Sequence, residues 1–243
     1  MKVCILKDLL LIIPAYNEED NIQRVVEDLI KNFSQYDYII VNDGSKDSTA
    51  DICREHGYNM VDLPINIGLE GAFQTGLKYA YRKGYKYVMQ YDGDGQHKAE
   101  YIESMLNEVK KGYDIVIGSR FVNKKKGMSL RMIGSRLISL AIRLTTGCHI
   151  KDLTSGMRIY GERVISEFVK NINYRPEPDT LSYLLKNGAR ISEVHVDMEE
   201  RTTGRSYLSI TRSVYYMVNM LCSILFIQII RKRDRKYVEQ EDK

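Results

Sequence analysis

The chain has 243 residues, of which 44% are hydrophobic and 28% are charged, which excludes a disordered or fibrous protein. This length accommodates one α/β domain with a full core and does not by itself require a second domain. The net charge of +4 conceals an asymmetry, because residues 1–120 hold 14 Lys and Arg against 19 Asp and Glu, whereas residues 121–243 hold 22 against 13. A basic second half forms a solvated face or suits an anionic partner such as phospholipid, lipid phosphate or nucleic acid.

The first half alternates short apolar runs with segments of helical periodicity. Strands are expected at residues 9–13, 37–41, 59–63, 85–91 and 114–118. Helices are expected between them, at residues 19–33, 48–56, 71–83 and 98–111. This alternation predicts an α/β fold with a mostly parallel, doubly wound sheet, and ligands of such sheets bind beyond the carboxyl ends of the strands.

After Arg120 the pattern changes. Residues 128–146 predict a basic, amphipathic helix, and the rest of this region predicts a loop that runs into a short strand at 152–160, a helix at 180–186 and a strand at 190–196. Four cysteines (Cys4, Cys53, Cys148 and Cys222) are scattered without metal-binding spacing, as expected for reduced thiols, and no secretory signal pattern opens the chain. We therefore expect the protein to work on the cytoplasmic side of the cell membrane.

Residues 214–230 are nearly continuously apolar and are followed at once by a basic tail. As a helix these residues would be about 25 Å long, slightly short of a hydrocarbon core of about 30 Å. We expect a membrane-interfacial or re-entrant helix, and the alternative is a helix of the core or of an oligomer interface. The sequence thus predicts a catalytic region at 1–210 and a membrane-associated region at 211–243.

The strongest chemical signal is the segment Asp92-Gly93-Asp94-Gly95-Gln96-His97, which directly follows the predicted strand 85–91. Two carboxylates two residues apart beyond a strand end can face one hard cation. Mg²⁺ or Mn²⁺ bound in this way completes its shell with water and the oxygens of a diphosphate. A metal site is therefore predicted at Asp92, Asp94 and Gln96.

Two other polar turns follow the first two predicted strands. In Pro14-Ala15-Tyr16-Asn17-Glu18, Tyr16 offers a flat face for a base and Asn17 can cap the next helix. In Asn42-Asp43-Gly44-Ser45, Asp43 can accept hydrogen bonds from a base or a ribose, and Ser45 or Ser48 can cap the next helix. Each turn alone is ordinary, but three at the carboxyl ends of neighbouring strands predict a nucleotide site.

These motifs together resemble the family 2 inverting glycosyltransferases of the GT-A fold. The resemblance rests on PAYNEE, NDGS, Asn66-Ile67-Gly68 with Gly71, Ala72 and Gly76, DGDGQH, Gly118-Ser119-Arg120, DLTSGMR at 152–158 and RTTGRS at 201–206. The order of the motifs is most similar to dolichyl-phosphate mannose synthases and their bacterial polyprenyl-phosphate relatives. It covers about residues 8–210 and implies a Rossmann-like, three-layer GT-A fold.

The resemblance also implies roles for individual residues. The nucleotide would be held by Pro14, Tyr16, Glu18 and Asp43. The metal and the donor diphosphate would be held by Asp92, Asp94 and Gln96. The donor and acceptor phosphates would be surrounded by Arg120, Arg131, Ser135, Arg201 and Arg205, because guanidinium groups pair with phosphate in a bidentate manner. Catalysis would depend chiefly on Asp92, Asp94, Arg120 and Arg131.

The activity that the resemblance implies is metal-dependent transfer of a sugar from a UDP- or GDP-sugar to a polyprenyl phosphate at a membrane surface. A lipid phosphate is already an anion near pH 7 and needs no general base. A glycan hydroxyl would need one, and Glu177 or Asp179 is the candidate base for that alternative, although Asp179 can equally cap the next helix.

Other classes of function are less well supported by the sequence. The intact DGD pair disfavours a binding protein without turnover. No recognition motif supports nucleic-acid binding, and we expect none. Because the chain offers one marginal apolar segment for anchoring, a homo-oligomer or a small membrane-protein partner is expected.

Overall fold

A computed structural model of the protein describes residues 7–95, 97–123, 130–171, 177–197 and 210–227. The first half alternates strands and helices: β1 (Leu9–Ala15), α1 (Ile22–Asn32), β2 (Asp37–Asn42), α2 (Thr49–Glu55), β3 (Met60–Asp62), α3 (Gly68–Lys83), β4 (Tyr87–Gln90), η1 (Ala99–Tyr101), α4 (Ile102–Val109) and β5 (Ile115–Ser119). Every strand and helix predicted for this half is present, so the α/β prediction is confirmed.

The second half is richer in helices. It contains α5 (Leu130–Thr146), β6 (Arg158–Gly161), α6 (Glu162–Lys170), α7 (Pro178–Lys186), β7 (Ile191–His195), α8 (Ile210–Cys222) and η2, a π-helical turn (Ser223–Ile227). The helix α6 was not predicted from the sequence. Its apolar residues Val164, Ile165 and Phe168 all face the core. A helix of nine residues is too short for this periodic pattern to be recognised in the sequence.

The described strands form one seven-stranded sheet in the order β3-β2-β1-β4-β6-β5-β7. All neighbours are parallel except β6, which runs antiparallel between β4 and β5. The predicted mostly parallel sheet is therefore confirmed, with one reversed strand. That reversal brings the start of β6 beside the end of β4, where Gln90 pairs with Arg158.

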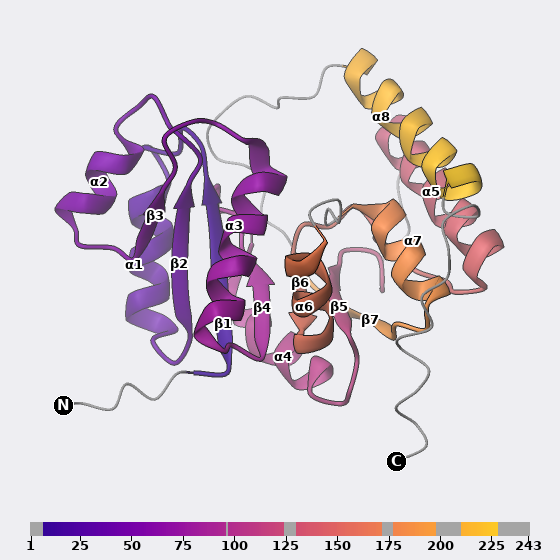
Figure 1. The fold of residues 1–243 in the computed structure, drawn as a ribbon, viewed down its shortest axis with the longest axis horizontal. Coiled ribbons are helices and arrows are strands. Elements are labelled where there is room, and N and C mark those ends of the chain that lie inside the picture. The colour runs from indigo at the N-terminus through magenta and orange to yellow at the C-terminus, as the bar shows by residue number, and fades with distance from the viewer. Residues whose placement is uncertain (1–6, 96, 124–129, 172–176, 198–209, 228–243) are drawn as a thin grey trace.

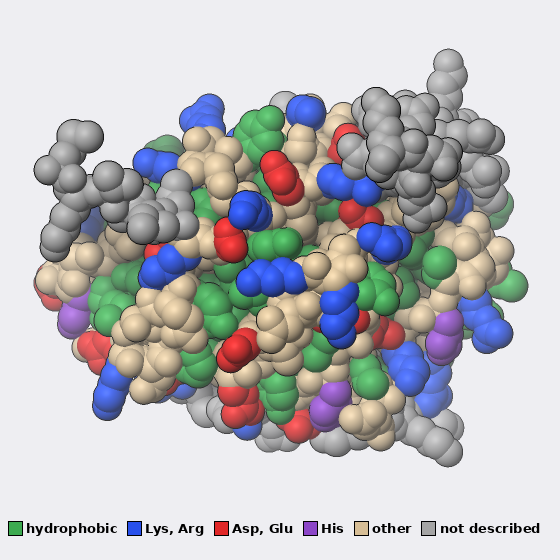
Figure 2. Space-filling view, turned by 90° about the horizontal axis from the view of Figure 1, so that it is seen from below, with side chains coloured by type: hydrophobic (Ala, Val, Ile, Leu, Met, Phe, Trp, Pro, Cys, Tyr) green, Lys and Arg blue, Asp and Glu red, His purple; other side chains and the backbone are tan. Residues whose placement is uncertain are grey.

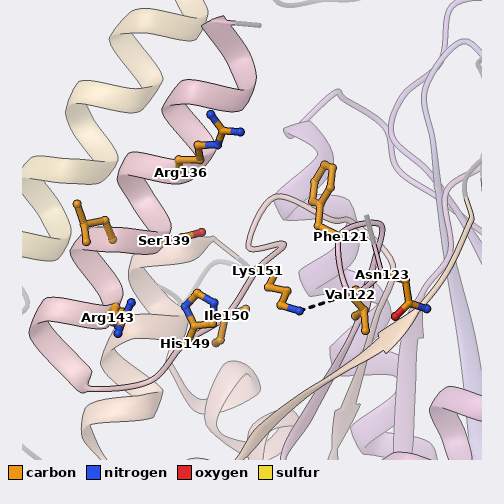
Figure 3. Close-up of a pocket in the computed structure, with 10 residues that line it drawn as sticks. Phe121, Val122, Asn123, Arg136, Ser139, Arg143, His149, Ile150 and Lys151 are labelled. Carbon is orange, nitrogen blue, oxygen red and sulfur yellow. Dashed lines mark hydrogen bonds between the residues drawn. The ribbon is translucent and has the colours of Figure 1, made fainter. Parts of the chain in front are cut away.

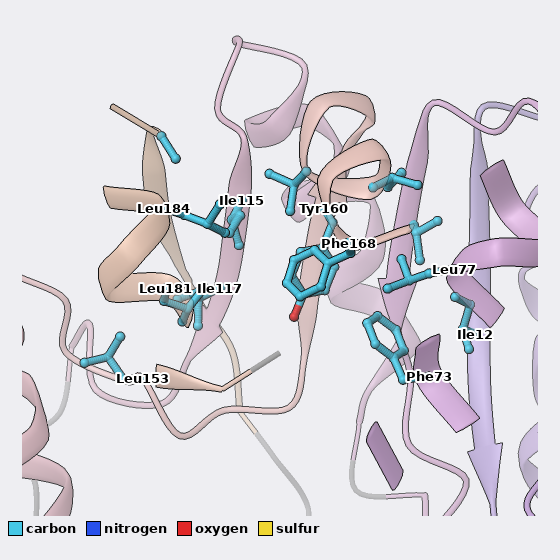
Figure 4. Close-up of a cluster of buried hydrophobic side chains, with 14 of the residues drawn as sticks. Ile12, Phe73, Leu77, Ile115, Ile117, Leu153, Tyr160, Phe168, Leu181 and Leu184 are labelled. Carbon is cyan, nitrogen blue, oxygen red and sulfur yellow. The ribbon is translucent and has the colours of Figure 1, made fainter. Parts of the chain in front are cut away.

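Helices cover both faces of the sheet (Figure 1). Along β1, Leu10 and Ile12 enter one hydrophobic cluster with α3 and α6, whereas Leu9, Leu11 and Ile13 enter a second cluster with α1 and α4. Figure 4 shows part of the first cluster. Burial on both faces explains why β1 is continuously apolar instead of alternating. The three layers place the carboxyl ends of the parallel strands at one edge of the sheet.

The helix α8 packs beside α5 at the end of the molecule opposite α2 (Figure 1). Its inner side enters the core through Met220, and Ile224 of η2 follows, whereas Tyr215 and Val218 are exposed. The helix predicted at 214–230 is helical as far as it is described: its α-helical part ends at Cys222, the π-helical turn η2 follows at Ser223–Ile227, and residues 228–230 lie outside the described residues. Within the described part of the chain, no helix has the length and hydropathy needed to span a bilayer. Contact of this region with a membrane stays a prediction.

The packing of α3 on β1 depends on Gly76. A Cβ atom at this position would lie 2.4 Å from Cγ2 of the buried Ile12. We expect Gly76→Val to lower the free energy of unfolding by about 2 kcal/mol or more, because a β-branched side chain must push the helix away from the sheet. Lys78→Val, on the exposed side of the same helix, serves as the control for helix propensity and should cost about 0.5 kcal/mol. Equal losses in urea unfolding of the two variants would contradict this account.

Candidate active site

The loops after β1 and β2 are joined by hydrogen bonds at the edge of the sheet. The backbone N–H of Asn17 donates to Ser45 Oγ at 3.0 Å, and Asn17 Oδ1 accepts from the N–H of Lys46 at 2.9 Å. Asn17 has a positive φ of 55°, a conformation that Asn tolerates better than most residues. Ser48 occupies the N-cap position of α2, as predicted, although its side chain makes no capping hydrogen bond. The N-cap of α1 is Asn21, so the capping prediction for Asn17 is wrong, as is the one for Ser45.

The predicted nucleotide residues lie around these joined loops. Pro14 is buried at the end of β1, and Glu18 accepts a hydrogen bond from Asn21 Nδ2 at 3.0 Å. Tyr16 lines an open hollow of 730 Å³ together with residues of the loops that follow β2 and β3. Asp43 is almost fully buried, and its Oδ1 accepts from the N–H of Ile67 at 2.7 Å. Asp43 thus holds the segment before α3 beside the hollow.

The carboxylate of Asp92 is supported from two sides just beyond β4. Gln90 Nε2 donates to Asp92 Oδ1 at 3.2 Å. The N–H of Asp92 donates to Nδ1 of the buried His97 at 3.0 Å, so the imidazole is in the tautomer that carries its proton on Nε2. That Nε2 lies 3.3 Å from Asp92 Oδ2. Asp92 is therefore fixed in orientation while its side chain stays 29% exposed.

The rest of this turn lies against the loop after β1. A Cβ atom at Gly93 would be 3.3 Å from the carbonyl oxygen of Pro14, and one at Gly95 would be 2.3 Å from an Nη of Arg24. Gly95 also has a positive φ of 77°. The half-buried Asp94 is between these two glycines. The turn therefore places two carboxylates beside the predicted nucleotide loops; Gln96, the third predicted ligand, lies outside the described residues.

Arg120 and Asp152 form a buried, bidentate ion pair. Arg120 Nε donates to Asp152 Oδ2 at 2.8 Å, and an Arg120 Nη donates to Asp152 Oδ1 at 2.9 Å. Asp152 is fully buried. Burial acts to raise the pKa of this carboxyl, but the hydrogen bonds and charge of Arg120, together with a hydrogen bond from Thr154, hold the pKa below its ordinary value. Arg120, predicted to contact phosphate, therefore directs two guanidinium nitrogens at Asp152.

The remaining predicted phosphate residues are only partly described. Ser135 is buried in α5 and lines a cavity of 330 Å³. Arg131 also belongs to α5, but its side chain is outside the described residues, as are Arg201 and Arg205 altogether. Of the four arginines predicted to surround phosphate, the structure therefore describes only the side chain of Arg120.

The cavity at Ser135 opens beside Asp92. It is lined by residues of α3, β4, α5, α7, α8 and the loop before β6: Leu69, Glu70, Gln90, Ser135, Ile138, Leu153, Thr154, Ser155, Gly156, Arg158, Glu177, Pro178, Tyr216 and Met217. Gly156 joins it to the acidic turn, because a Cβ atom there would be 3.0 Å from Asp92 Oδ2. Burial and the charge of Glu177 raise the pKa of Tyr216 on the opposite wall. A cavity with a mostly apolar surface and a few polar side chains thus adjoins the carboxylate turn.

The structure adds His97, Gly156 and Asp152 to the predicted site. His97 and Gly156 both belong to motifs that the sequence marks, DGDGQH and DLTSGMR. His97 lies in the same turn as Asp92. The proximity of Gly156 to Asp92 depends on the antiparallel β6, whose direction the sequence does not reveal. Asp152 is recognisable only as the acidic start of the second motif.

Asp92 and Asp94 fit a small divalent cation that is completed by other ligands. Within the described residues, no three His, Cys, Asp or Glu side chains gather into a site that could hold a metal ion alone. Mg²⁺ commonly uses one or two carboxylates and takes its other ligands from water and substrate phosphates. The partial exposure of Asp92 and the small Gly156 beside it leave room for such a ligand.

The chain is similar in sequence to proteins of known name. The chain is 35% identical over 213 residues to the UDP-N-acetylglucosamine–dolichyl-phosphate N-acetylglucosaminyltransferase of Methanococcus voltae, covering 76% of this chain and 83% of that protein. It is 29% identical over 213 residues to the polyprenol monophosphomannose synthase of Mycolicibacterium smegmatis, covering 82% and 80%.

A solved structure shares the fold. Glucosyl-3-phosphoglycerate synthase from Mycobacterium tuberculosis, in complex with Mn²⁺, uridine diphosphate and phosphoglyceric acid, superposes with a TM-score of 0.64. The superposition covers 90% of this chain and 79% of that one at 16% identity. Residues 10–168 match the sequence model of the protein family described as "Glycosyl transferase family 2". The chain therefore belongs to glycosyltransferase family 2 and is a glycosyltransferase enzyme.

Proposed function

We propose that the enzyme transfers a sugar from a UDP- or GDP-sugar to a polyprenyl phosphate, with inversion and with Mg²⁺ or Mn²⁺, at the cytoplasmic face of the cell membrane. The observation that carries this proposal is the juxtaposition of the Asp92–Asp94 turn with a cavity that α5 and α8 help to line and whose surface is mostly apolar. The relatives named for dolichyl-phosphate and polyprenol monophosphate products point to the same class of acceptor.

The residues divide into two groups around the reacting atoms. Tyr16 and the loops after β1 and β2 would hold the nucleotide. Asp92 and Asp94, with Gln96, would bind the cation, which when present offsets the negative charge that develops on the departing nucleoside diphosphate. Phosphate oxygens would be held by Arg120, Arg131, Ser135, Arg201 and Arg205, and Arg120 would also orient the loop of Asp152. The acceptor phosphate is ionised near pH 7, so it would attack the anomeric carbon without a general base.

A location at the membrane surface is supported by exposed apolar residues on α5 and α8. Ile133, Leu137, Leu140 and Leu144 are exposed on α5, and Tyr215 and Val218 are exposed on α8. Exposed apolar side chains gathered on neighbouring helices mark an interaction surface. The region 211–243, which we propose as the membrane-associated part, begins with α8.

Transfer to a glycan hydroxyl is the second candidate, and Glu177 is the observation that favours it. Glu177 precedes α7 and lines the cavity beside Asp92. Asp179, the other candidate base, is held by the structure around it: its Oδ1 accepts from the N–H of Thr180 at 2.7 Å and its Oδ2 accepts from Ser223 Oγ at 2.8 Å. Glu177 is therefore the residue that tests the acceptor class.

We expect Glu177→Gln to keep transfer to polyprenyl phosphate within about fivefold of the unsubstituted enzyme, because an ionised acceptor needs no base. If the acceptor is a hydroxyl, the same substitution should lower the transfer rate by about 10²-fold or more. Asp179→Asn, which retains the size of the side chain, is the matched control. The measurement supplies labelled UDP- and GDP-sugars with Mg²⁺ or Mn²⁺ and undecaprenyl phosphate and counts label in the organic phase. Donor binding without labelled lipid would overturn the polyprenyl-phosphate proposal.

A further inference from the structure

A second cavity, of 510 Å³, lies between α5 and the two segments 121–123 and 149–151 (Figure 3). It shares no lining residue with the cavity beside Asp92. Four of its lining side chains are basic: Arg136, Arg143, His149 and Lys151. None of the lining residues is acidic. The cavity therefore suits an anion, and none of the predicted catalytic residues whose side chains the structure describes lines it.

The cations approach the cavity from two sides. Arg136 and Arg143 are exposed and lie seven residues apart on α5, which places them two turns apart on one face of the helix. Lys151 comes from the other wall, where its Nζ donates to the carbonyl oxygen of Val122 at 3.0 Å (Figure 3). An ammonium group has three N–H donors, so this contact fixes its position and leaves donors for an anion. Two guanidinium groups and one oriented ammonium thus surround the same space.

An apolar ridge runs along α5 directly beside these cations. It consists of Ile133, Leu137, Leu140 and Leu144, which are 41%, 46%, 50% and 74% exposed. Their spacing of three and four residues places them on one face of the helix. Leu140 also lines the cavity, so the ridge and the basic cavity are continuous. In Figure 2, basic and hydrophobic side chains lie side by side at the right-hand end of the molecule, where α5 is located.

We propose that this cavity binds the phosphate head group of an anionic phospholipid while the apolar ridge of α5 enters the membrane interface. A free phosphate would use the cations but not the ridge. A second copy docked symmetrically through this face would set two basic cavities against each other and leave their positive charge uncompensated. An anionic bilayer matches both the basic cavity and the apolar ridge, because burial of apolar side chains and attraction to anionic lipids both contribute to binding at a membrane interface. The inference rests on the proposed action at a membrane surface and adds a lipid site distinct from the acceptor site.

The test measures binding of the full chain to sedimenting vesicles. Binding to vesicles of phosphatidylcholine alone is compared with binding to vesicles that also contain about 30% phosphatidylglycerol. We expect the double variant Arg136→Gln/Arg143→Gln to bind anionic vesicles about 30-fold more weakly, at about fivefold for each basic residue near the surface. Binding to neutral vesicles, which depends on the ridge, should change by less than about threefold. Glycerol phosphate in solution should compete only weakly.

A matched control removes the same charge elsewhere. Lys31→Gln/Arg82→Gln replaces two exposed cations of α1 and α3 that do not line the cavity. If this control weakens binding to anionic vesicles as much as Arg136→Gln/Arg143→Gln, binding depends on net charge alone and the site is disproved. Equal binding of the unsubstituted chain to neutral and anionic vesicles also disproves it, as does full competition by millimolar glycerol phosphate. Circular dichroism confirms that both double variants are folded.

Activity separates this inference from the proposed function. With a short-chain polyprenyl phosphate dissolved in detergent, Arg136→Gln/Arg143→Gln should transfer sugar within about twofold of the unsubstituted rate, since no bilayer is needed. With acceptor embedded in anionic vesicles the rate should fall in step with binding. If the variant loses as much transfer rate in detergent as it does with vesicles, these arginines belong to the acceptor site, and the proposal of a separate lipid site is overturned. Failure of the unsubstituted enzyme to label any polyprenyl phosphate, with selective vesicle binding intact, would overturn the proposed function alone.

Discussion

Asp94→Asn is expected to lower the rate of sugar transfer by about a thousandfold, or ~4 kcal/mol of transition-state free energy. The substitution preserves the size of the side chain, replaces one acceptor oxygen by an amide donor, and removes one of the two negative charges that would hold the cation. Asp94 lies between Gly93 and Gly95 in a turn whose path is fixed by the loop of Pro14 and by Arg24. The loss should therefore arise from the missing charge and not from refolding of the turn.

The measurement combines turnover with donor binding. Titration of UDP and GDP into the unsubstituted enzyme should show tighter binding with Mn²⁺ than with a chelator, and Asp94→Asn should abolish that difference. Asp28→Asn, an exposed carboxylate of α1, is the control and should leave both rate and binding unchanged. Metal-dependent binding that survives in Asp94→Asn would show that the cation is held elsewhere.

The first half of the fold could be predicted because each strand is buried on both faces. The runs at residues 9–13 and 114–118 are apolar at nearly every position, and polar turns mark where they end. In the second half, the helix at 128–146, the short strand that ends at 160, the helix at 180–186 and the strand at 190–196 were also predicted and are present as α5, β6, α7 and β7. The helix α6 and the antiparallel direction of β6 were not predicted. The strand β6, Arg158–Gly161, has only four residues, and nothing in so short a segment indicates which way it runs beside its neighbours.

The candidate site shows the same division. Asp92 and Asp94 could be identified from the sequence because the residue types and their spacing carry the chemistry. The support of Asp92 by His97 could not, since His is more often a surface or core residue and its tautomer depends on a backbone N–H. The ion pair of Arg120 could not be predicted either. Its motif indicates a phosphate contact, which stays a prediction, whereas its partner Asp152 is 32 residues away and meets it only through the order of β5 and β6.

Arg120→Gln is expected to destabilise the enzyme by about 3 kcal/mol at pH 7, the lower end of the cost of leaving one member of a buried ion pair without its partner. Asp152 is fully buried, and it accepts from Arg120 Nε, Nη and backbone N–H. Its own N–H donates to Glu193 Oε1 at 2.7 Å, which ties the loop to β7. The carboxylate therefore cannot move to water without disturbing the edge of the sheet.

The pH dependence of that loss gives the sharper test. In the unsubstituted enzyme the pKa of Asp152 is below its ordinary value, so its contribution to stability is present above about pH 4 and is lost only as pH falls through the lowered pKa. Without the Arg120 guanidinium, only the hydrogen bonds from Thr154 and from the backbone N–H of residue 120 still oppose burial, and we expect burial to raise the pKa of Asp152 above the unfolded value. The folded variant then binds the proton more tightly than the unfolded chain, and its relative stability improves as pH falls from 7 toward 4.

The difference in unfolding free energy between the unsubstituted enzyme and Arg120→Gln should therefore shrink across this range of pH. Asp152→Asn carries no charge and provides the control, because its difference from the unsubstituted enzyme should not shrink between pH 7 and pH 5. The double variant Arg120→Gln/Asp152→Asn should be more stable at pH 7 than Arg120→Gln alone, because the unpaired buried charge is gone. A loss in Arg120→Gln that is constant from pH 7 to pH 4 would show that Arg120 acts through packing and not through the charge of Asp152.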